Sequence, residues 1–432
     1  MLGYPETSNF IRKSRDRAGL IHMNLLWLSH LLPFPPKGGA AQRSYHLIKS
    51  VSEHFNIDLV AFNQRKIHKG KAQIDSAVVE FKKFCSDVHV FKIPSDTFYF
   101  GNSILAIKSL LSPLPYNINW LFSPEVHSFV KNLSKNKQYD LIWCDTISLI
   151  PYVKYFNAKV SILNHHNIES DTMFRRSENE SNLFKKAYYK LEGVKLQKTE
   201  KKYCNFFSLN VTCSELDKYR LQSRLLSGKI CIIPNGVDTD YFKATARPQK
   251  PNSLIFAGTL SWYPNKQAVL FFIDKIWPLL KIKNPLVHIS FIGKDPPERL
   301  IQLSKKCPQI KVTGFVDDVR PYIEEASVYV CPIMDGGGTK LKILDALSMG
   351  KAIVAHPVAC EGIDVRENEE VLFAETPEQF VDKIDFLLSN DFRFSMGIKG
   401  RSLIERLYSY KQIGKTLITE LKSLTADMAQ EG

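Results

Sequence analysis

Residues 331–350 read CPIMDGGGTKLKILDALSMG, an apolar strand-like run followed by three glycines and a helix-like pattern. Glycine adopts positive φ angles without steric cost and lets the backbone pass close to a ligand. We expect a helix to begin near Gly338-Thr339, where free N–H groups and the positive end of the helix dipole favour a phosphate. Lys340 or Lys342 adds a full positive charge there, and Asp345 offers an acceptor for sugar or ribose hydroxyls. These features fit a nucleoside diphosphate, although glycine turns after strands also occur in α/β proteins without one.

The chain has 432 residues, more than one hydrophobic core usually serves, so we expect two domains. Short apolar runs alternate with helical stretches, which predicts an α/β protein with two doubly wound, Rossmann-like domains facing across a cleft. The expected strands are 24–29, 57–62, 88–92, 141–144, 160–164 and 209–213 in a first series, then 230–234, 253–258, 287–292, 310–313, 328–332, 352–356 and 371–374. We expect a basic tail or upstream extension over 1–22, domains over 23–228 and 229–391, and helices over 392–432 that pack back towards the N-terminal domain.

The positive charge belongs to the first half of the chain. Residues 1–250 hold 36 Lys and Arg against 21 Asp and Glu, whereas residues 251–432 hold 22 against 23. This asymmetry indicates an anionic partner, such as nucleic acid, an acidic membrane surface or a phosphate-bearing substrate, unless it is simply a solvated basic face. Residues 182–204 have helical apolar spacing and seven lysines, which fits a helix on anionic lipid or an ordinary surface helix. The apolar run 103–111 is a second candidate for lipid or acceptor contact, but we expect it to pack in the core.

Eight cysteines are scattered singly, without a Cys-x-x-Cys pair. Such cysteines are typical of reduced core thiols in a cytosolic protein and not of a zinc site or a disulfide framework. No apolar stretch approaches the length needed to span a bilayer. We therefore expect a cytoplasmic protein, either free or peripheral on the inner face of the cell membrane.

Three further loops follow expected strands at the positions where open α/β sheets bind ligands. Gly38-Gly39 forms a glycine turn that enters a helix near Ala40. A polar cluster, His165 to Ser170, comes directly after an apolar strand, and Gly258-Thr259 opens the second domain's glycine turn. Each loop alone fits ordinary turn chemistry, but their order along two doubly wound domains points to one shared site.

Residues 234–238 (PNGVD), 313–319 (TGFVDDV) and 336–350 together resemble the pattern of glycosyltransferase family 4, in a glycine-rich-loop subset, over about residues 23–425. His166-Asn167-Ile168-Glu169-Ser170 is similar to the family's histidine loop, and Gly38-Gly39 to its first-domain glycine turn. The resemblance implies a GT-B fold with an N-terminal acceptor domain and a C-terminal donor domain. It also implies a retaining transferase that moves a sugar from a UDP- or GDP-sugar to a hydroxyl of a glycan or lipid-linked acceptor, in surface polysaccharide biosynthesis, with no cofactor and no metal.

The resemblance also implies roles for individual residues. Lys342 would neutralise the leaving diphosphate, and His166 would touch the donor sugar near the reacting carbon. Asp345, at a usual glutamate position, would hold the ribose hydroxyls. The remaining donor-binding residues are Gly258, Thr259, Gly337, Gly338, Thr339 and Lys340 at the phosphates, and Phe315 and Val316 at the nucleobase. The acceptor-side residues are Gly38, Gly39, Asn167 and Glu169.

Two departures from the family pattern stand out. Gly337 occupies the position of the first of two paired glutamates, so backbone amides or Asp335 would have to replace that carboxylate. Thr259 stands where the family has an arginine, and Lys266 is a candidate substitute for the missing cation. Both departures bear on the identity of the donor more than on the fold.

The expected chemistry builds negative charge on the leaving β-phosphate, which preorganised cations and helix amides stabilise. Because no nucleophile paired with a base is visible, we expect front-side attack by the acceptor hydroxyl, with the leaving phosphate taking its proton. Two alternatives stay open: a sugar-nucleotide epimerase of the same fold, and a catalytically silent partner subunit. A nucleic-acid partner is not expected, because the basic half has no base-stacking or helix-turn-helix pattern.

Overall fold

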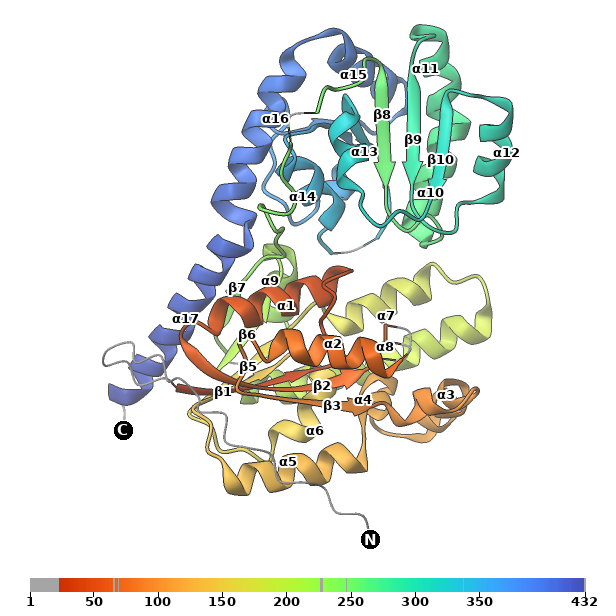
Figure 1. Ribbon diagram of the computed structural model, residues 1–432. Coiled ribbons are helices and arrows are strands. Elements are labelled where there is room, and N and C mark those ends of the chain that lie inside the picture. Colours follow the sequence, from red (N-terminus) through yellow and green to blue (C-terminus); the bar gives the residue numbers. More distant parts are fainter. Residues whose placement is uncertain are drawn as a thin grey trace.

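The computed structural model describes residues 23–430 except 65, 66, 69, 226, 227, 246 and 337. The expected tail at 1–22 and the expected phosphate ligand Gly337 lie outside the described residues. Two parallel sheets, each covered by helices on both faces, lie one above the other and are joined along one side by a long C-terminal helix (Figure 1). The fold is GT-B, as expected.

The first sheet has strand order β3-β2-β1-β4-β5-β6-β7, and the second has β10-β9-β8-β11-β12-β13. All neighbouring strands within these sheets run parallel. The strands are β1 Met23–Ser29, β2 Phe55–Asn63, β3 Asp87–Lys92, β4 Leu141–Cys144, β5 Val160–Asn164, β6 Leu209–Thr212, β7 Ile230–Ile232, β8 Ser253–Ala257, β9 His288–Ile292, β10 Ile310–Gly314, β11 Val328–Cys331, β12 Ala352–Ala355 and β13 Leu372–Phe373. Every expected strand is present, since short apolar runs covered on both faces suit central parallel strands.

The helices cover both faces of each sheet and supply most of the connections between strands. Those of the N-terminal part are α1 Gly39–Val51, α2 Lys71–Phe81, α3 Gly101–Leu111, α4 Tyr116–Leu121, α5 Pro124–Asn136, α6 Ile150–Val153, α7 Glu169–Glu178, α8 Leu183–Tyr203 and α9 Glu215–Gln222, with short turns η1 Pro94–Thr97, η2 Ile147–Leu149 and η3 Cys204–Phe206. Those that follow are α10 Tyr263–Phe271, α11 Trp277–Lys283, α12 Glu298–Lys306, α13 Arg320–Glu325, α14 Leu341–Ser348, α15 Pro377–Ser389, α16 Phe392–Leu403 and α17 Tyr410–Gln430, with η4 Phe272–Ile276, η5 Pro357–Cys360 and η6 Ile404–Tyr408.

The strand near residue 230 belongs to the first sheet and not, as we expected from a boundary at 228/229, to the second. β7 pairs in parallel with β6, and the following Ile233 is fully buried in the N-terminal core. The second sheet therefore begins only at β8. An isolated apolar triplet carries no sign of which sheet edge it will extend, so the sequence pattern could not decide this.

The C-terminal helix α17 returns to the N-terminal part of the molecule (Figure 1). Its apolar residues Ile413, Leu417 and Leu421 are buried in the same core as Leu47 and Ile48 of α1. At its start, Tyr410 stacks on His46 of α1 with ring centroids 4.1 Å apart. This packing ties the chain end to the glycine-turn helix of the first domain.

All eight cysteines are free thiols, and seven are buried, which fits their expected place in the core. Among the described residues, no helix is both long enough and apolar enough to cross a membrane. The run 103–111, which we expected in the core, instead forms the surface helix α3 with most of its apolar side chains exposed.

Candidate active site

The loops that the sequence singled out meet between the two sheets. A Cβ atom placed on Gly39, at the start of α1, would lie 3.6 Å from Cδ1 of Leu341, the first residue of α14. A Cβ atom on Gly338 would lie 3.1 Å from Oδ1 of Asn167. The glycine turn and the histidine loop of the first domain are therefore in near contact with the glycine-rich loop and the start of α14 in the second domain.

The glycine-rich loop ends later in the chain than we expected from the sequence, at Lys340. Gly336 and Gly338 have φ angles of 106° and 75°, and helix α14 begins only at Leu341, not near 338–339. Nζ of Lys340 donates hydrogen bonds to the carbonyl oxygens of Gly336 and Gly338, at 2.6 and 2.9 Å. Lys340 is buried, and burial lowers the pKa of its ammonium group. Its observed contacts hold the loop in shape, whereas we had expected it to face the phosphates.

Lys342 is the cation placed at the loop after β8. Its Nζ donates a hydrogen bond to Oδ1 of Asn265 at 2.6 Å and lies 4.5 Å from the ring centre of Phe256. A Cβ atom on Gly258 would come within 2.6 Å of the same Nζ, so glycine leaves the room that this side chain occupies. Burial lowers the pKa of Lys342 to about 8. The ammonium group is thus still mostly protonated at pH 7, although its removal from water makes the charged form less favourable.

Asn265 was missed by the sequence reasoning. It lies on α10 and is buried, and its Nδ2 donates to the carbonyl oxygen of Thr259 at 2.8 Å while its Oδ1 accepts from Lys342. One amide therefore fixes the β8 loop and the lysine together. Its only sequence signal was its position seven residues after Gly258, inside a turn-to-helix junction.

Asp345 lies on α14, one helical turn after Lys342. Burial raises the pKa of its carboxyl group to about 8. Among the described residues, its buried Oδ1 atom has no hydrogen-bond partner, and neither has the buried Oγ1 of Thr339. Buried polar atoms are nearly always paired in folded proteins, so these two atoms mark a part of the site where the hydrogen bonding among the described residues is incomplete.

The other expected donor residues lie around this centre with fewer contacts. Phe315 and Val316 follow β10, and the Phe315 ring is largely exposed. Asp335, a candidate for the missing carboxylate, accepts a hydrogen bond from the Gly336 amide at 2.6 Å and so belongs to its own loop. Lys266, the candidate substitute cation, is an exposed residue of α10.

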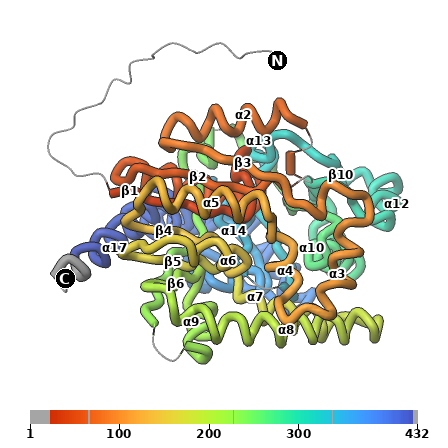
Figure 2. The backbone as a smooth tube through the Cα atoms, turned by 90° about the horizontal axis from the view of Figure 1, so that it is seen from below, coloured from red at the N-terminus to blue at the C-terminus, as the bar shows by residue number. Residues whose placement is uncertain are grey.

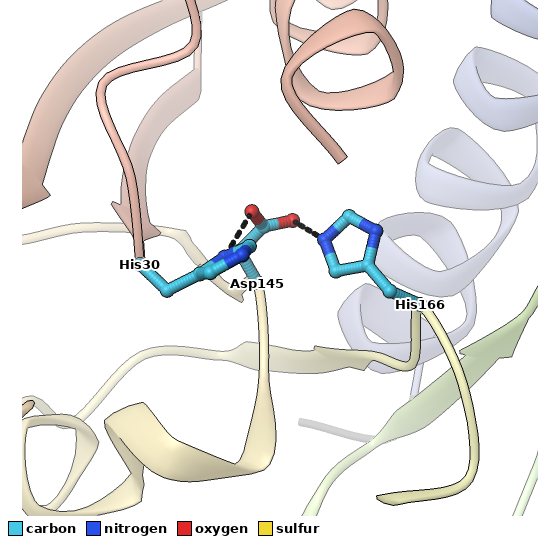
Figure 3. Close-up of side chains that lie close together, drawn as sticks. All are labelled: His30, Asp145 and His166. Carbon is cyan, nitrogen blue, oxygen red and sulfur yellow. Dashed lines mark hydrogen bonds and ion pairs between the residues drawn. The ribbon is translucent and has the colours of Figure 1, made fainter. Parts of the chain in front are cut away.

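On the N-terminal side, His166 is held by Asp145, which follows β4 (Figure 3). Nε2 of His166 lies 3.3 Å from Oδ1 of Asp145, and Nδ1 of His30 lies 3.2 Å from Oδ2. The carboxylate also accepts hydrogen bonds from Ser44 at 2.8 Å and Asn164 at 3.1 Å. His30 and Asp145 were missed, although each follows a buried strand, the position that we used to select the histidine loop.

The electrostatics of this cluster follow from burial and pairing. Burial lowers the pKa of His166, and the neighbouring Asp145 offsets this only in part. Burial would raise the pKa of Asp145, but the interactions with His166 and His30 outweigh it and hold that pKa well below its usual range. The result is an ionised carboxylate that accepts an N–H from each imidazole and so fixes which ring nitrogen carries the proton.

The same three side chains form the candidate metal group of the described residues, with ligand atoms within 4.8 Å of one another. The two imidazoles face different oxygens of Asp145, as Figure 3 shows, and both oxygens also accept hydrogen bonds from hydroxyl or amide groups. Hydrogen bonding therefore accounts for the whole arrangement.

Two further polar groups border the histidine loop. Oε2 of Glu169 accepts a hydrogen bond from Asn117 of α4 at 3.2 Å, and burial raises the pKa of Glu169 to about 7. Arg43 of α1, fully buried, donates to Oδ1 of Asn164 at 3.1 Å and to the carbonyl oxygen of Pro234 at 2.8 Å. Arg43 thus links the histidine side of the site to the segment that connects the two domains.

Two facing doubly wound domains, with a glycine-rich loop and a buried lysine opposite a histidine loop, define the GT-B class of glycosyltransferases. The family comparison agrees: residues 37–241 match the model of Glycosyltransferase Family 4, and residues 251–390 match that of Glycosyl transferases group 1. The chain belongs to glycosyltransferase family 4 and is a glycosyltransferase.

Curated relatives are distant. An "uncharacterized 44.6 kDa protein in cps region" of Klebsiella pneumoniae is 22% identical over 372 residues, which cover 81% of this chain and 89% of that protein. A phosphatidyl-myo-inositol mannosyltransferase of Mycobacterium tuberculosis is 28% identical over 143 residues, 32% of this chain and 37% of the relative.

Solved structures with the same fold include HepE of Anabaena in complex with UDP and glucose. It has a TM-score of 0.58 and 15% identity, and the match covers 93% of this chain and all of that chain. A variant of S. aureus TarM bound to fondaparinux, α-GlcNAc-glycerol and UDP has a TM-score of 0.64 and 13% identity, with 93% and 100% covered. At these identities the likeness shows the fold.

Proposed function

We propose that this glycosyltransferase moves a sugar from a nucleotide-sugar donor, a UDP- or GDP-sugar, to a hydroxyl of a glycan or lipid-linked acceptor, with retention of anomeric configuration and without a metal. The observation that carries the proposal is Lys342, whose partly buried ammonium group is held by Asn265 against the glycine loop after β8. The UDP bound to HepE and to TarM supports a uridine nucleotide as the first donor class to test.

The charges at the site match the needs of such a transfer. Departure of a nucleoside diphosphate places negative charge on the β-phosphate, and a cation in a water-poor site stabilises that charge strongly. Lys342 supplies the cation, and the N-terminus of α14 adds unpaired amides beside it. Because the protein itself supplies this positive charge, we infer that no divalent metal is needed.

The histidine side suits the sugar. His166 has one ring nitrogen fixed by Asp145, so its other nitrogen is left to meet a hydroxyl near the reacting carbon. The carboxylate beside it is already bonded to several donors and is a poor nucleophile. This arrangement supports front-side attack by the acceptor hydroxyl, with its proton passing to the leaving phosphate, and hence retention.

The acceptor is proposed from charge and from one relative. The protein from the cps region of Klebsiella pneumoniae supports a role in surface polysaccharide assembly. The excess of Lys and Arg in residues 1–250 supports a phosphate-bearing, lipid-linked acceptor and work at the inner face of the cell membrane.

A panel of nucleotide sugars tests the proposal. Purified protein is mixed with UDP-, GDP- and ADP-sugars with and without EDTA, and thermal shift and slow release of nucleoside diphosphate are measured. We expect stabilisation by the UDP or GDP class, unaffected by EDTA and lost in Lys342→Ala. Absence of any response would contradict the proposal and favour a catalytically silent subunit. For a sugar that turns over with an acceptor, the anomeric configuration of the product by NMR tests retention.

A further inference from the structure

Helix α3 exposes large apolar side chains to solvent, which is unusual for a helix on the surface of a soluble monomer. Ile104, Ile107 and Leu111, spaced along one helix face, are 50%, 66% and 90% exposed, while Ser109 is buried. The carbonyl oxygen of Ser109 accepts a hydrogen bond from Nζ of Lys195 on α8 at 2.6 Å, and its hydroxyl accepts one from Asn119. Ser109 is thus bonded to the protein, while the three apolar side chains face outward together with the polar Asn102, Ser103 and Lys108.

The segment before α3 continues this surface. Phe98, Tyr99 and Phe100 join η1 to α3 and are 71%, 93% and 66% exposed. Soluble monomers rarely show a contiguous apolar patch of this kind, and such patches mark interaction sites. We call Phe98, Tyr99, Phe100, Ile104, Ile107 and Leu111 the α3 apolar face.

The tip of the α7–α8 hairpin projects on the same side of the molecule as α3 in both views (Figures 1 and 2). It carries two more exposed apolar side chains, Leu183 and Phe184, followed directly by the exposed Lys185 and Lys186. The two elements are also bonded together, because Lys195 of α8 holds α3 and Glu192 of α8 accepts from the Tyr116 amide of α4. Lys195 thus joins α8 directly to α3.

The exposed charge of the two helices is positive. Lys108 is the single charged residue of α3, and α8 exposes lysines at 185, 186, 190, 198, 201 and 202. The acidic residues of α8, Glu192 and Glu200, are buried and paired with Lys195 and Arg224. The only acidic side chains of the turn before α8 are those of Glu178 and Glu180.

We propose that the α3 apolar face and the α7–α8 tip dock this protein on an anionic lipid bilayer. Aromatic and aliphatic side chains enter the interface while lysines at the rim meet lipid phosphates, the combination that binds peripheral proteins to acidic membranes. A second copy of the chain fits less well, because a two-fold contact through this surface would bring lysines against lysines.

Docking in this way would bring a half-open cavity between these helices close to the bilayer. The cavity, about 270 Å³, lies between α3, α4, α7 and α8 and is lined by Ala106, Tyr116, Asn117, Met173, Arg176 and Tyr189 among others. Asn117 also donates to Glu169, three residues after His166. The acceptor side of the site therefore adjoins a cavity to which α3 contributes Ala106, and this position suits an acceptor carried on a lipid. This step rests on the proposed function, whereas the docking itself does not.

Co-sedimentation of the full chain with vesicles tests the proposal. We expect binding to vesicles of phosphatidylcholine and phosphatidylglycerol at 7:3, weakening from 0.1 to 0.5 M salt, and at least about tenfold weaker binding to pure phosphatidylcholine. The triple variants Tyr99→Ser/Phe100→Ser/Leu111→Ser and Lys185→Glu/Lys186→Glu/Lys190→Glu should each bind the anionic vesicles about tenfold more weakly. All altered side chains are exposed, so thermal unfolding should be unchanged.

Matched controls lie on the C-terminal domain: Ile282→Ser/Leu286→Ser for the apolar change and Lys305→Glu/Lys306→Glu for the charge change, all at exposed positions. Equal binding to neutral and anionic vesicles, or equal loss in the controls, would overturn the proposal. A dimer seen by light scattering and lost in the Tyr99/Phe100/Leu111 variant, without vesicle binding, would assign the surface to self-association. Stabilisation by nucleotide sugar, measured on the same samples, keeps a failure of docking distinct from a failure of the proposed activity.

Discussion

The two sides of the cleft bury charge in opposite ways. On the histidine side, Asp145 accepts hydrogen bonds from His30, His166, Ser44 and Asn164, so its carboxylate is fully used by the protein. On the glycine-loop side, the described residues offer the Lys342 ammonium one hydrogen-bond acceptor, Asn265, and they leave Oδ1 of Asp345 without a partner.

The difference indicates which side waits for a ligand. Leaving a buried polar atom unpaired costs about 1–3 kcal/mol, a cost that a bound ligand removes when it supplies the missing partner. The hydrogen bonds of Asp145 hold the side chains of the histidine side in place in the free protein, whereas we propose that the donor completes the glycine-loop side. We call the cluster around Asp145 and His166 the preset side, and the loop around Lys342 and Asp345 the unfinished side. Substitutions on the two sides should therefore have different effects.

The largest effect is expected for Lys342→Ala. Removing the cation that faces the leaving diphosphate should lower the transfer rate about a hundredfold or more, or about 2.7 kcal/mol of barrier. Stability should not fall, because burying this ammonium is itself unfavourable, as its lowered pKa shows. Initial rates and thermal unfolding of the variant measure both effects. Lys281→Ala, at an exposed lysine of α11, is the matched control, and near-normal turnover by Lys342→Ala would remove Lys342 from its role.

Asp145→Asn should damage the preset side in a different way. An asparagine amide cannot accept from all of the donors that surround this position, so stability should fall by about 2 kcal/mol. Because His166 loses the acceptor that fixes its proton, turnover should also fall about tenfold. Chemical denaturation and kinetics check this, with Asp87→Asn at an exposed carboxylate as the control. A stability loss without a change in turnover would reduce Asp145 to a structural role.

The sequence predicted the preset side less well than the unfinished side. Strand order and glycine turns pointed to Gly258, Lys342 and Asp345, whereas His166 stood in the polar loop 165–170 and took its expected role from the resemblance to glycosyltransferase family 4. Asp145 and His30 were missed because they are single polar residues after strands, without a neighbouring motif. Their meaning appears only when parallel strands β1, β4 and β5 lie side by side and bring three loops together.

Two errors in the fold have a similar origin. The apolar run of α3 looked like core, since sequence spacing shows that a helix has an apolar face but not which way that face points. The start of α14 was placed too early, because the tie between Lys340 and the carbonyls of Gly336 and Gly338 is a tertiary contact of a loop that no periodicity encodes.

The pH dependence of stability offers a milder test of the unfinished side. The folded protein keeps the proton on Asp345 up to about pH 8, whereas an unfolded aspartate loses it near pH 4. Stability should therefore fall as pH rises from about 4 to 8, because the unfolded state releases a proton that the folded state retains. Asp345→Asn mimics the protonated group and lacks this loss. Its stability relative to the native protein should rise by about 3.5 kcal/mol between pH 5 and 8. A constant difference across this range would mean that Asp345 is ionised in the folded protein.

The smallest effect is expected for substitution of Asn265, the residue that accepts a hydrogen bond from Lys342. Asn265→Asp retains an oxygen at the position that accepts from Nζ and adds a negative charge, which should raise the pKa of Lys342 from about 8 by one unit or more. If the transfer needs the charged lysine, activity should fall at a higher pH in this variant, because the pKa of Lys342 is higher. This shift should be visible even if the maximal rate drops several-fold. Asn265→Ala is the companion variant, which removes the partner without adding charge and should leave the alkaline limb in place or move it downward. An alkaline limb that stays fixed in Asn265→Asp would show that another group controls it, and that Asn265 acts on the loop after β8 alone, through its bond to Thr259.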